Sequence, residues 1–193
     1  MICAGIDYST LSPSICVYKK DGPVNPSNCN FSFFALDKWR PRWAALQNVN
    51  VYKFPKEIKD IDRYLFLADW TIEQIRWYTG RVQKVILEDY SFGSTGRVFH
   101  IAENVGILKS FLKKNGFRYE TIAPTTIKKF ATGKGNSNKE AMLEAWKAEP
   151  GTFELVQENG NPSTDIVDSY FLCKYGVTPV SYTHLTLPTN REV

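Results

Sequence analysis

Four acidic residues lie where carboxylates could act together. Asp7 and Glu88 each end a short apolar run, and Asp165 and Asp168 are three residues apart. Side chains at i and i+3 share one face of a helix, so the two aspartates would point the same way. Carboxylates at the ends of adjacent strands, facing such a helix, repel one another unless hard cations such as Mg²⁺ lie between them. Two such ions about 3.5 to 4 Å apart can activate water for in-line phosphoryl displacement.

Taken singly, each of these acids also has an ordinary structural interpretation. Asp7 and Glu88 could simply end their strands, and Asp168 could be a surface charge. Asp165 could be favoured by the helix dipole, because it lies near the start of a helical pattern. The chemistry therefore depends on whether the fold brings the four together.

The cysteines and histidines do not indicate a zinc site beside the four acids. The four cysteines are scattered without a Cys-x-x-Cys pair, and there are only two histidines. This spacing argues against a zinc site. Cys3, Cys16 and Cys173 lie in apolar stretches, where a free thiol behaves as a small hydrophobe, so we expect them to fill the core.

The composition is that of one globular domain. The chain has 193 residues, of which 43% are hydrophobic and 23% charged, and no apolar run approaches the roughly 18 to 20 residues that span a bilayer. The first residues lack a basic, apolar signal pattern, so a cytoplasmic location is expected. We predict one domain over residues 1–177. Residues 178–193 follow neither helical nor strand periodicity and are interpreted as a tail foreign to the domain.

The net charge of +4 is concentrated in the middle of the chain. Residues 97–147 carry ten basic and four acidic side chains, a local charge of +6. Such a block is a plausible footprint for a polyanion such as DNA. Solvated helix faces would produce the same pattern, so charge alone does not decide between them.

The elements that must position the acids follow from periodicity. We expect an opening antiparallel meander, then helices alternating with parallel strands, which describes a mixed α/β sheet flanked by helices. The segment 38–42 is basic, aromatic and irregular and is expected to leave the sheet. Strands are predicted over 2–8, 14–20, 31–36, 49–54, 82–87 and 119–123, and helices over 56–80, 97–114, 124–131, 138–146 and 164–171.

Four segments resemble, in order, the motifs of the RuvC family of Holliday junction resolvases, particularly its phage-type members. They are Gly5-Ile6-Asp7, Val85-Ile86-Leu87-Glu88, the run 131–139 with its Gly-Lys-Gly loop, and Asp165-Ile166-Val167-Asp168-Ser169-Tyr170. The resemblance covers residues 2 to about 175. It implies an RNase H-like fold, a homodimer formed across the 97–114 helix, and metal-dependent cutting of four-way DNA junctions.

The resemblance assigns roles to particular residues. Asp7, Glu88, Asp165 and Asp168 fall on the catalytic carboxylates of the family, which bind Mg²⁺ or Mn²⁺, two ions per site. Lys139 falls on the lysine beside that site, where an ammonium could stabilise charge on the scissile phosphate.

Lysines of the basic block are the expected DNA contacts. Lys128, Lys134 and Lys139 would bind phosphates, and backbone N–H groups of the loop 133–138 can approach one. Arg97, at the start of the block, is a further expected DNA-binding residue. The loop lacks the Gly-x-x-x-x-Gly-Lys-Ser/Thr pattern, so no nucleotide cofactor is expected.

The chain departs from the bacterial members after the catalytic glutamate. It reads Asp89-Tyr90-Ser91-Phe92, where bacterial members have a glutamine and then a phenylalanine that opens the junction. Tyr90 or Phe92 could stack on a base and serve as that wedge, or could pack under the following loop.

The resulting prediction is a metal-dependent, structure-selective endonuclease that resolves Holliday junctions and other branched DNA. One alternative is an RNase H-like nuclease for RNA:DNA hybrids or flaps, and another is a junction-binding protein without catalysis. An actin-like or sugar-kinase-like ATPase also opens with Gly-Ile-Asp. Such an ATPase needs a second Asp-x-Gly motif and a longer chain, and this sequence has neither. The expected partners are branched DNA and a second copy of the chain, with no membrane.

Overall fold

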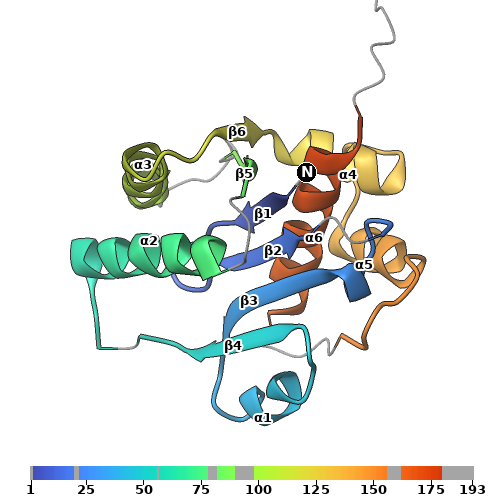
Figure 1. Cartoon of the computed structure of the whole chain (residues 1–193), viewed down its shortest axis with the longest axis horizontal. Coiled ribbons are helices and arrows are strands. Elements are labelled where there is room, and N and C mark those ends of the chain that lie inside the picture. Colours follow the sequence, from blue (N-terminus) through green and yellow to red (C-terminus); the bar gives the residue numbers. More distant parts are fainter. Residues whose placement is uncertain are drawn as a thin grey trace, which may run out of the picture.

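The structure, a computed structural model, describes residues 2–19, 22–55, 57–77, 82–89, 98–155 and 162–179. These form one six-stranded sheet in the order β4-β3-β2-β1-β5-β6, with helices on both faces (Figure 1). The strands are β1 (Cys3–Asp7), β2 (Ser14–Tyr18), β3 (Cys29–Ala35), β4 (Val49–Lys53), β5 (Lys84–Glu88) and β6 (Tyr119–Ile122). The helices are η1 (Pro26–Asn28), α1 (Arg40–Ala44), α2 (Asp60–Trp77), α3 (Val98–Lys114), α4 (Pro124–Thr132), α5 (Lys139–Lys147) and α6 (Ser163–Val177).

The sheet is mixed, as the sequence predicts. β1, β2 and β3 pair antiparallel, whereas β5 pairs parallel with β1 and β6 parallel with β5. The predicted meander is too long by one strand, because β4 runs parallel to β3. The chain returns through α1 between these two strands, so it enters β4 in the direction of β3.

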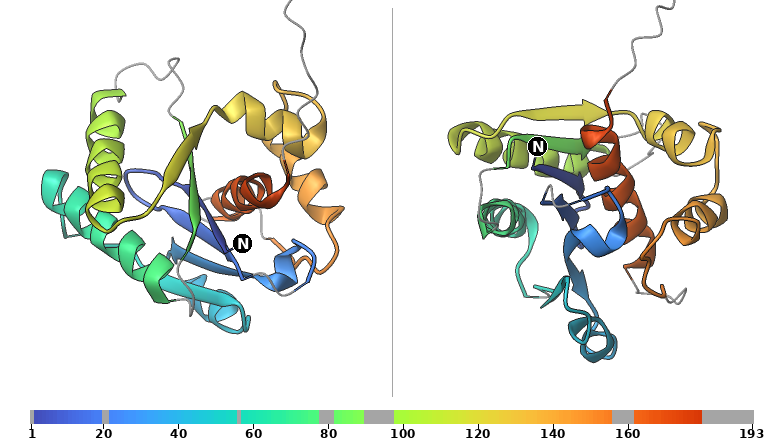
Figure 2. Two further views of the ribbon diagram at one scale, coloured as in Figure 1. Left: turned by 45° about the horizontal axis from the view of Figure 1, so that its top comes forward. Right: turned by 45° about the vertical axis from the view of Figure 1, so that its right-hand side comes forward.

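Each face of the sheet has its own core. On one face, α4, α5 and α6 pack with residues such as Phe31 and Phe33 of β3. On the other, α2 and α3 pack with residues such as Ile6 of β1, and Figure 2 shows the two helical layers on either side of the sheet. Because side chains alternate along a strand, Asp7 shares the α6 face with Cys3, and Glu88 shares it with Ile86.

Helix α6 lies unusually close to β1 and β5. A Cβ added to Gly5 would be 2.2 Å from the carbonyl oxygen of Ser169 and from the amide nitrogen of Cys173. One added to Gly176 would be 2.6 Å from Cys3 Sγ and from a side-chain carbon of Ile86. These close approaches at Ser169, Cys173 and Gly176 fix α6 against the central strands.

The segment 38–42 differs from the sequence prediction. It enters the short helix α1, where Trp43 is fully buried. The Trp43 ring packs edge-on against Phe33, with ring centroids 5.4 Å apart, and against Phe153 at 6.0 Å. A large aromatic anchor thus orders a stretch whose composition alone indicated an irregular loop.

Some element boundaries also shift. Helix α2 begins at Asp60 rather than 56, with Asp60 and Asp62 in its first turn, where the helix dipole stabilises acidic side chains. Helix α6 starts at Ser163 and continues to Val177. Residues 180–193 lie outside the described residues, so the interpretation of 178–193 as a foreign tail stays a prediction. None of the described helices is both long and apolar enough to cross a bilayer.

Candidate active site

Two of the four carboxylates stand side by side at one edge of the sheet. Asp7 is the last residue of β1 and Glu88 the last of β5. These strands are parallel neighbours, and their pairing runs up to Ile6 opposite Leu87. Asp7 and Glu88 each follow that pair by one residue, so the register places them at the same level on the α6 face.

The other two carboxylates come from the start of α6. Asp165 lies in its first turn and Asp168 one turn later, and both are half-buried, as are Asp7 and Glu88. Asp165 accepts hydrogen bonds from Ser12 Oγ at 3.4 Å and from Thr164 Oγ1 at 3.2 Å. Ser12 belongs to the turn between β1 and β2, so this contact ties the α6 terminus to the end of β1.

The four groups act on one another electrostatically. Burial raises the pKa of Asp7 well above its usual range, and the charges of Asp165, Glu88 and Asp168 raise it further. Burial and then Asp168 raise the pKa of Glu88 to about 7. Burial and then Asp165 raise the pKa of Asp168 to about 6. Burial also raises the pKa of Asp165, although its two hydroxyl donors oppose the shift. The fold thus gathers charge that favours a cation or a proton.

This clustering makes stability depend on pH in a defined direction. Because the folded pKa values are raised, the folded state holds protons that the unfolded chain releases, so stability falls as pH rises from about 4 through 7. In metal-free buffer, we expect the melting temperature of the wild type to fall between pH 5.5 and 8, and that of Glu88→Gln to fall less. Thermal unfolding of both proteins across this range measures the difference. Equal slopes would show that Glu88 does not titrate as described.

Two predicted lysines face the carboxylates. Lys128, on α4, is half-buried, and its charge lowers the pKa of Glu88 and of Asp168. Lys139, the first residue of α5, is exposed, and its charge lowers the pKa of Asp7. Lys128 was expected as a phosphate contact, but it lies close enough to the acids to balance their charge.

Lys134 lies in a loop that is held by hydroxyl groups. Thr132 Oγ1 donates to the carbonyl oxygen of Lys128 at 2.7 Å and lies 2.6 Å from Ser137 Oγ. The carbonyl oxygen of Lys134 lies 2.8 Å from Ser137 Oγ. Gly133 adopts φ +82°, which suits glycine, as α4 ends. The Lys134 side chain is exposed to solvent beside this ordered loop.

The structure places some predicted residues and adds others. Tyr90, Phe92 and Arg97 lie outside the described residues, so their DNA-binding roles stay predictions. The two residues that sequence reasoning missed are Ser12 and Thr164, the hydroxyl donors to Asp165. A serine-rich turn directly after Asp7 was the only signal for Ser12.

The donor set fits divalent cations that prefer oxygen. All four side chains are carboxylates, which hard ions such as Mg²⁺ bind. Among the described residues, only three cysteines form a group of potential ligands whose ligand atoms all lie within 4.8 Å of one another. No three of the four carboxylates therefore bring their oxygens within 4.8 Å of one another.

Comparison with known proteins relates this arrangement to one fold. No protein-family model and no curated protein matches the chain. The structure of Thermus thermophilus RuvC superposes with a TM-score of 0.60 at 16% identity, covering 90% of this chain and 91% of that one. Thermus thermophilus RuvC in complex with a Holliday junction substrate superposes with a TM-score of 0.63 at 15% identity, covering 90% of each. The fold is that of RuvC.

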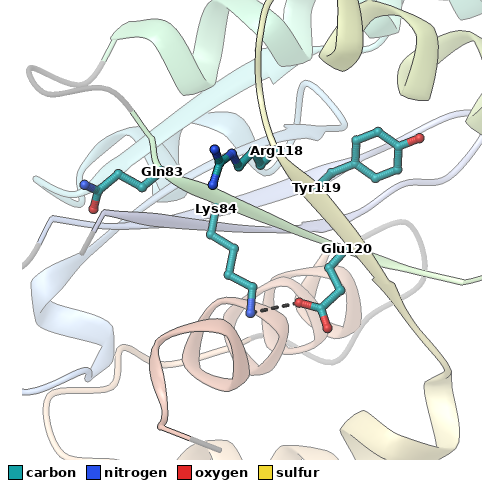
Figure 3. A pocket seen from close by; sticks show the side chains of 5 residues that line it. All are labelled: Gln83, Lys84, Arg118, Tyr119 and Glu120. Carbon is teal, nitrogen blue, oxygen red and sulfur yellow. Dashed lines mark ion pairs between the residues drawn. The ribbon is translucent and has the colours of Figure 1, made fainter.

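The RuvC fold confirms the predicted RNase H-like architecture. This architecture has an antiparallel unit followed by parallel strands, with helices on both sides. The carboxylates lie at the end of β1 and β5 that faces the start of α6. A separate pocket of about 480 Å³ lies at the opposite end of β5, where the Lys84 ammonium is 2.8 Å from a Glu120 oxygen (Figure 3). Because it lies a strand length from Glu88, this pocket does not belong to the carboxylate site.

Proposed function

We propose that this protein is a metal-dependent, structure-selective endonuclease that resolves four-way DNA junctions and related branches. One observation carries the proposal. Four half-buried carboxylates from β1, β5 and α6 converge at one edge of a RuvC-fold sheet, where the charges of Asp165, Glu88 and Asp168 raise the pKa of Asp7. Burying like charges together is costly unless cations share the site. The solved relative with a Holliday junction substrate bound supports branched DNA as the partner.

Each residue of the site has a role in this proposal. Asp7, Glu88, Asp165 and Asp168 would hold two Mg²⁺ or Mn²⁺ ions. The chemistry that such ions supply is activation of water and neutralisation of charge on the phosphate. Ser12 and Thr164 orient the Asp165 carboxylate, since hydrogen bonds to a ligand fix its direction.

The DNA and the second subunit complete the proposal. Lys134 and Lys139 are exposed and can bind phosphates, and the charge of Lys139 acts on Asp7. A homodimer would present two such sites to the two opposed strands of a junction. The dimer rests on the sequence resemblance, and sedimentation of the free protein and of its junction complex tests it.

The proposed function is tested with a labelled four-way junction beside a linear duplex of the same sequence. We expect paired nicks on the junction in Mg²⁺, no nicks in EDTA, and little cutting of the duplex. RNA:DNA hybrid and flap substrates are included in the same assay. Preferred cutting of either would replace the junction assignment with that of another nuclease on the same fold.

The assay also separates catalysis from binding. Binding is measured in Ca²⁺, and cutting is then started with Mg²⁺. Tight junction binding without any cutting would favour a non-catalytic junction-binding protein. Absence of both would contradict the proposal and leave the basic block as a solvated surface.

Lys139 is expected to support cutting more than binding. It is the first residue of α5, where the helix dipole disfavours a cation, yet its charge acts on Asp7, Asp165 and Asp168. Removing a positive group that faces developing charge costs on the order of 100-fold in rate. We expect Lys139→Ala to lower single-turnover cutting by about that factor.

Lys134→Ala is the matched control for this prediction, because Lys134 is exposed in the loop just before α5. A phosphate contact alone should weaken binding and reduce its salt dependence, with near-normal cutting at saturation. If Lys139→Ala behaves in the same way as Lys134→Ala, Lys139 is a DNA contact and not a part of the reaction site.

A further inference from the structure

Cysteines from distant parts of the chain meet in the core. Cys16 on β2, Cys29 on β3 and Cys173 on α6 place their Sγ atoms all within 4.8 Å of one another. All three residues are at most 1% exposed. Their spacing in sequence gave no sign of a metal site, because the strand pairing and the docking of α6 create the proximity.

The spacing of these sulfurs is close to that of a metal site. With a metal–sulfur bond of about 2.3 Å, three coordinating sulfurs stand roughly 3.8 to 4.0 Å apart. The observed group needs a contraction of less than about 1 Å to reach this distance. A disulfide instead needs an S–S distance of about 2.05 Å and brings only two sulfurs together. Cys16 and Cys29 are also not directly opposite, because Cys16 pairs with Phe31 and Tyr18 with Cys29.

We propose that Cys16, Cys29 and Cys173 form a structural site for one thiophilic metal ion, Zn²⁺ or Cu⁺. Thiolate sulfur is the ligand that these ions prefer, whereas Mg²⁺ prefers oxygen. The site is distinct from the carboxylates, which lie at the edge of the sheet, while the sulfurs lie inside the core. The proposed metal site does not depend on the proposed nuclease activity.

Metal binding must displace the protons of the three thiols. The Cys173 thiol, which donates to the carbonyl oxygen of Cys3 at 3.3 Å, would give up that hydrogen bond. The released protons pass to solvent, so metal binding strengthens as pH rises.

The site would hold α6 in place. Cys173 lies at the point where α6 touches Gly5, and Asp168 is only five residues earlier on the same helix. A metal bridge from Cys173 to β2 and β3 would lock the helix that carries two of the four carboxylates. Because the sulfurs are buried, the ion would enter as the chain folds, which couples metal binding to stability.

The test uses the full chain, expressed with added Zn²⁺ and, separately, refolded anaerobically with Co²⁺ or with Cu⁺ under reducing conditions. We expect one retained Zn²⁺ or Cu⁺ per chain after desalting, and a sulfur-to-cobalt charge-transfer band in the near ultraviolet. That band reports thiolate ligands, so Co²⁺ bound to carboxylates does not produce it. An ion at about 100 times its dissociation constant should raise the melting temperature by roughly 5 to 10 °C.

Two variants locate the ligands. Cys29→Ala is expected to lose the band and the metal-dependent rise in melting temperature. Cys3→Ala, at the fourth buried cysteine, is expected to keep both. Should Cys29→Ala fail to fold, Cys16→Ser provides the same comparison. A wild-type protein with no sulfur-to-cobalt band and no retained Zn²⁺ or Cu⁺ would overturn the proposal, whatever the result for junction cleavage.

Discussion

Asp7→Asn is expected to reduce junction cleavage on the order of 1000-fold while leaving junction binding in Ca²⁺ nearly unchanged. Asp7 ends the central strand and is acted on by all three other carboxylates. The amide keeps the size of the side chain but removes the charge that would bind a cation. Single-turnover cutting in Mg²⁺, with binding measured separately, gives the two quantities.

The same substitution should stabilise the metal-free protein. A buried carboxylate that three others repel lowers the free energy of unfolding at neutral pH, and asparagine relieves that repulsion. A higher melting temperature together with lost activity would identify Asp7 as a residue kept for function at the expense of stability.

Asp69→Asn serves as the control, because Asp69 is an exposed acid on α2. We expect it to change neither cutting nor stability appreciably. If Asp7→Asn cuts junctions at the wild-type rate, the carboxylate site is not the catalytic site.

Gly5→Ala has the largest expected effect on stability. The new methyl group would stand 2.2 Å from backbone atoms of Ser169 and Cys173, which no side-chain rotation can relieve. Helix α6 would have to move away from β1, and overpacking of this kind costs about 3 kcal/mol or more. For a chain of this length, that corresponds to a melting temperature lower by roughly 6 to 12 °C. Cutting should fall as well, because Asp165 and Asp168 move with the helix.

Gly106→Ala is the matched comparison for this prediction. Gly106 lies in the middle of α3, and an added Cβ would have nothing within 4 Å. Alanine favours a helix over glycine by about 1 kcal/mol, so this variant should be slightly stabilised. Chemical denaturation of both variants gives the sign of the change in the free energy of unfolding for each. Equal destabilisation would show that close approach at Gly5 is not the cause.

The strand ends that carry Asp7 and Glu88 were predictable from sequence. Each acid follows a short apolar run, and a buried strand must end where a charge needs solvent or a partner. The fold class followed from the order of these runs and the helical patterns between them. The direction of β4 did not follow, because the turn through α1 depends on burial of Trp43, a tertiary contact that periodicity does not reveal.

The surroundings of the site were less predictable than its acids. Thr164 directly precedes Asp165 on α6, whereas Ser12 is an ordinary turn residue until docking of α6 brings Asp165 to it. The cysteines show the same limit more strongly. Cys16 and Cys173 are separated by more than 150 residues, so spacing rules for metal ligands cannot detect them as a group. Their burial was predicted correctly, and their proximity was not.

The contact between Gly5 and α6 also bears on how the protein is made. The ribosome delivers the central strand long before the helix that covers it, since Ser169 and Cys173 lie more than 160 residues after Gly5. A nascent chain shorter than 168 residues lacks at least one of the four carboxylates, and β1 still lacks its final backbone neighbour. Contacts between residues so far apart in sequence form late and slowly during folding. If the proposed activity holds, chains that lack α6 cannot assemble the site and cannot cut DNA, so translation itself delays the nuclease until α6 has been synthesised.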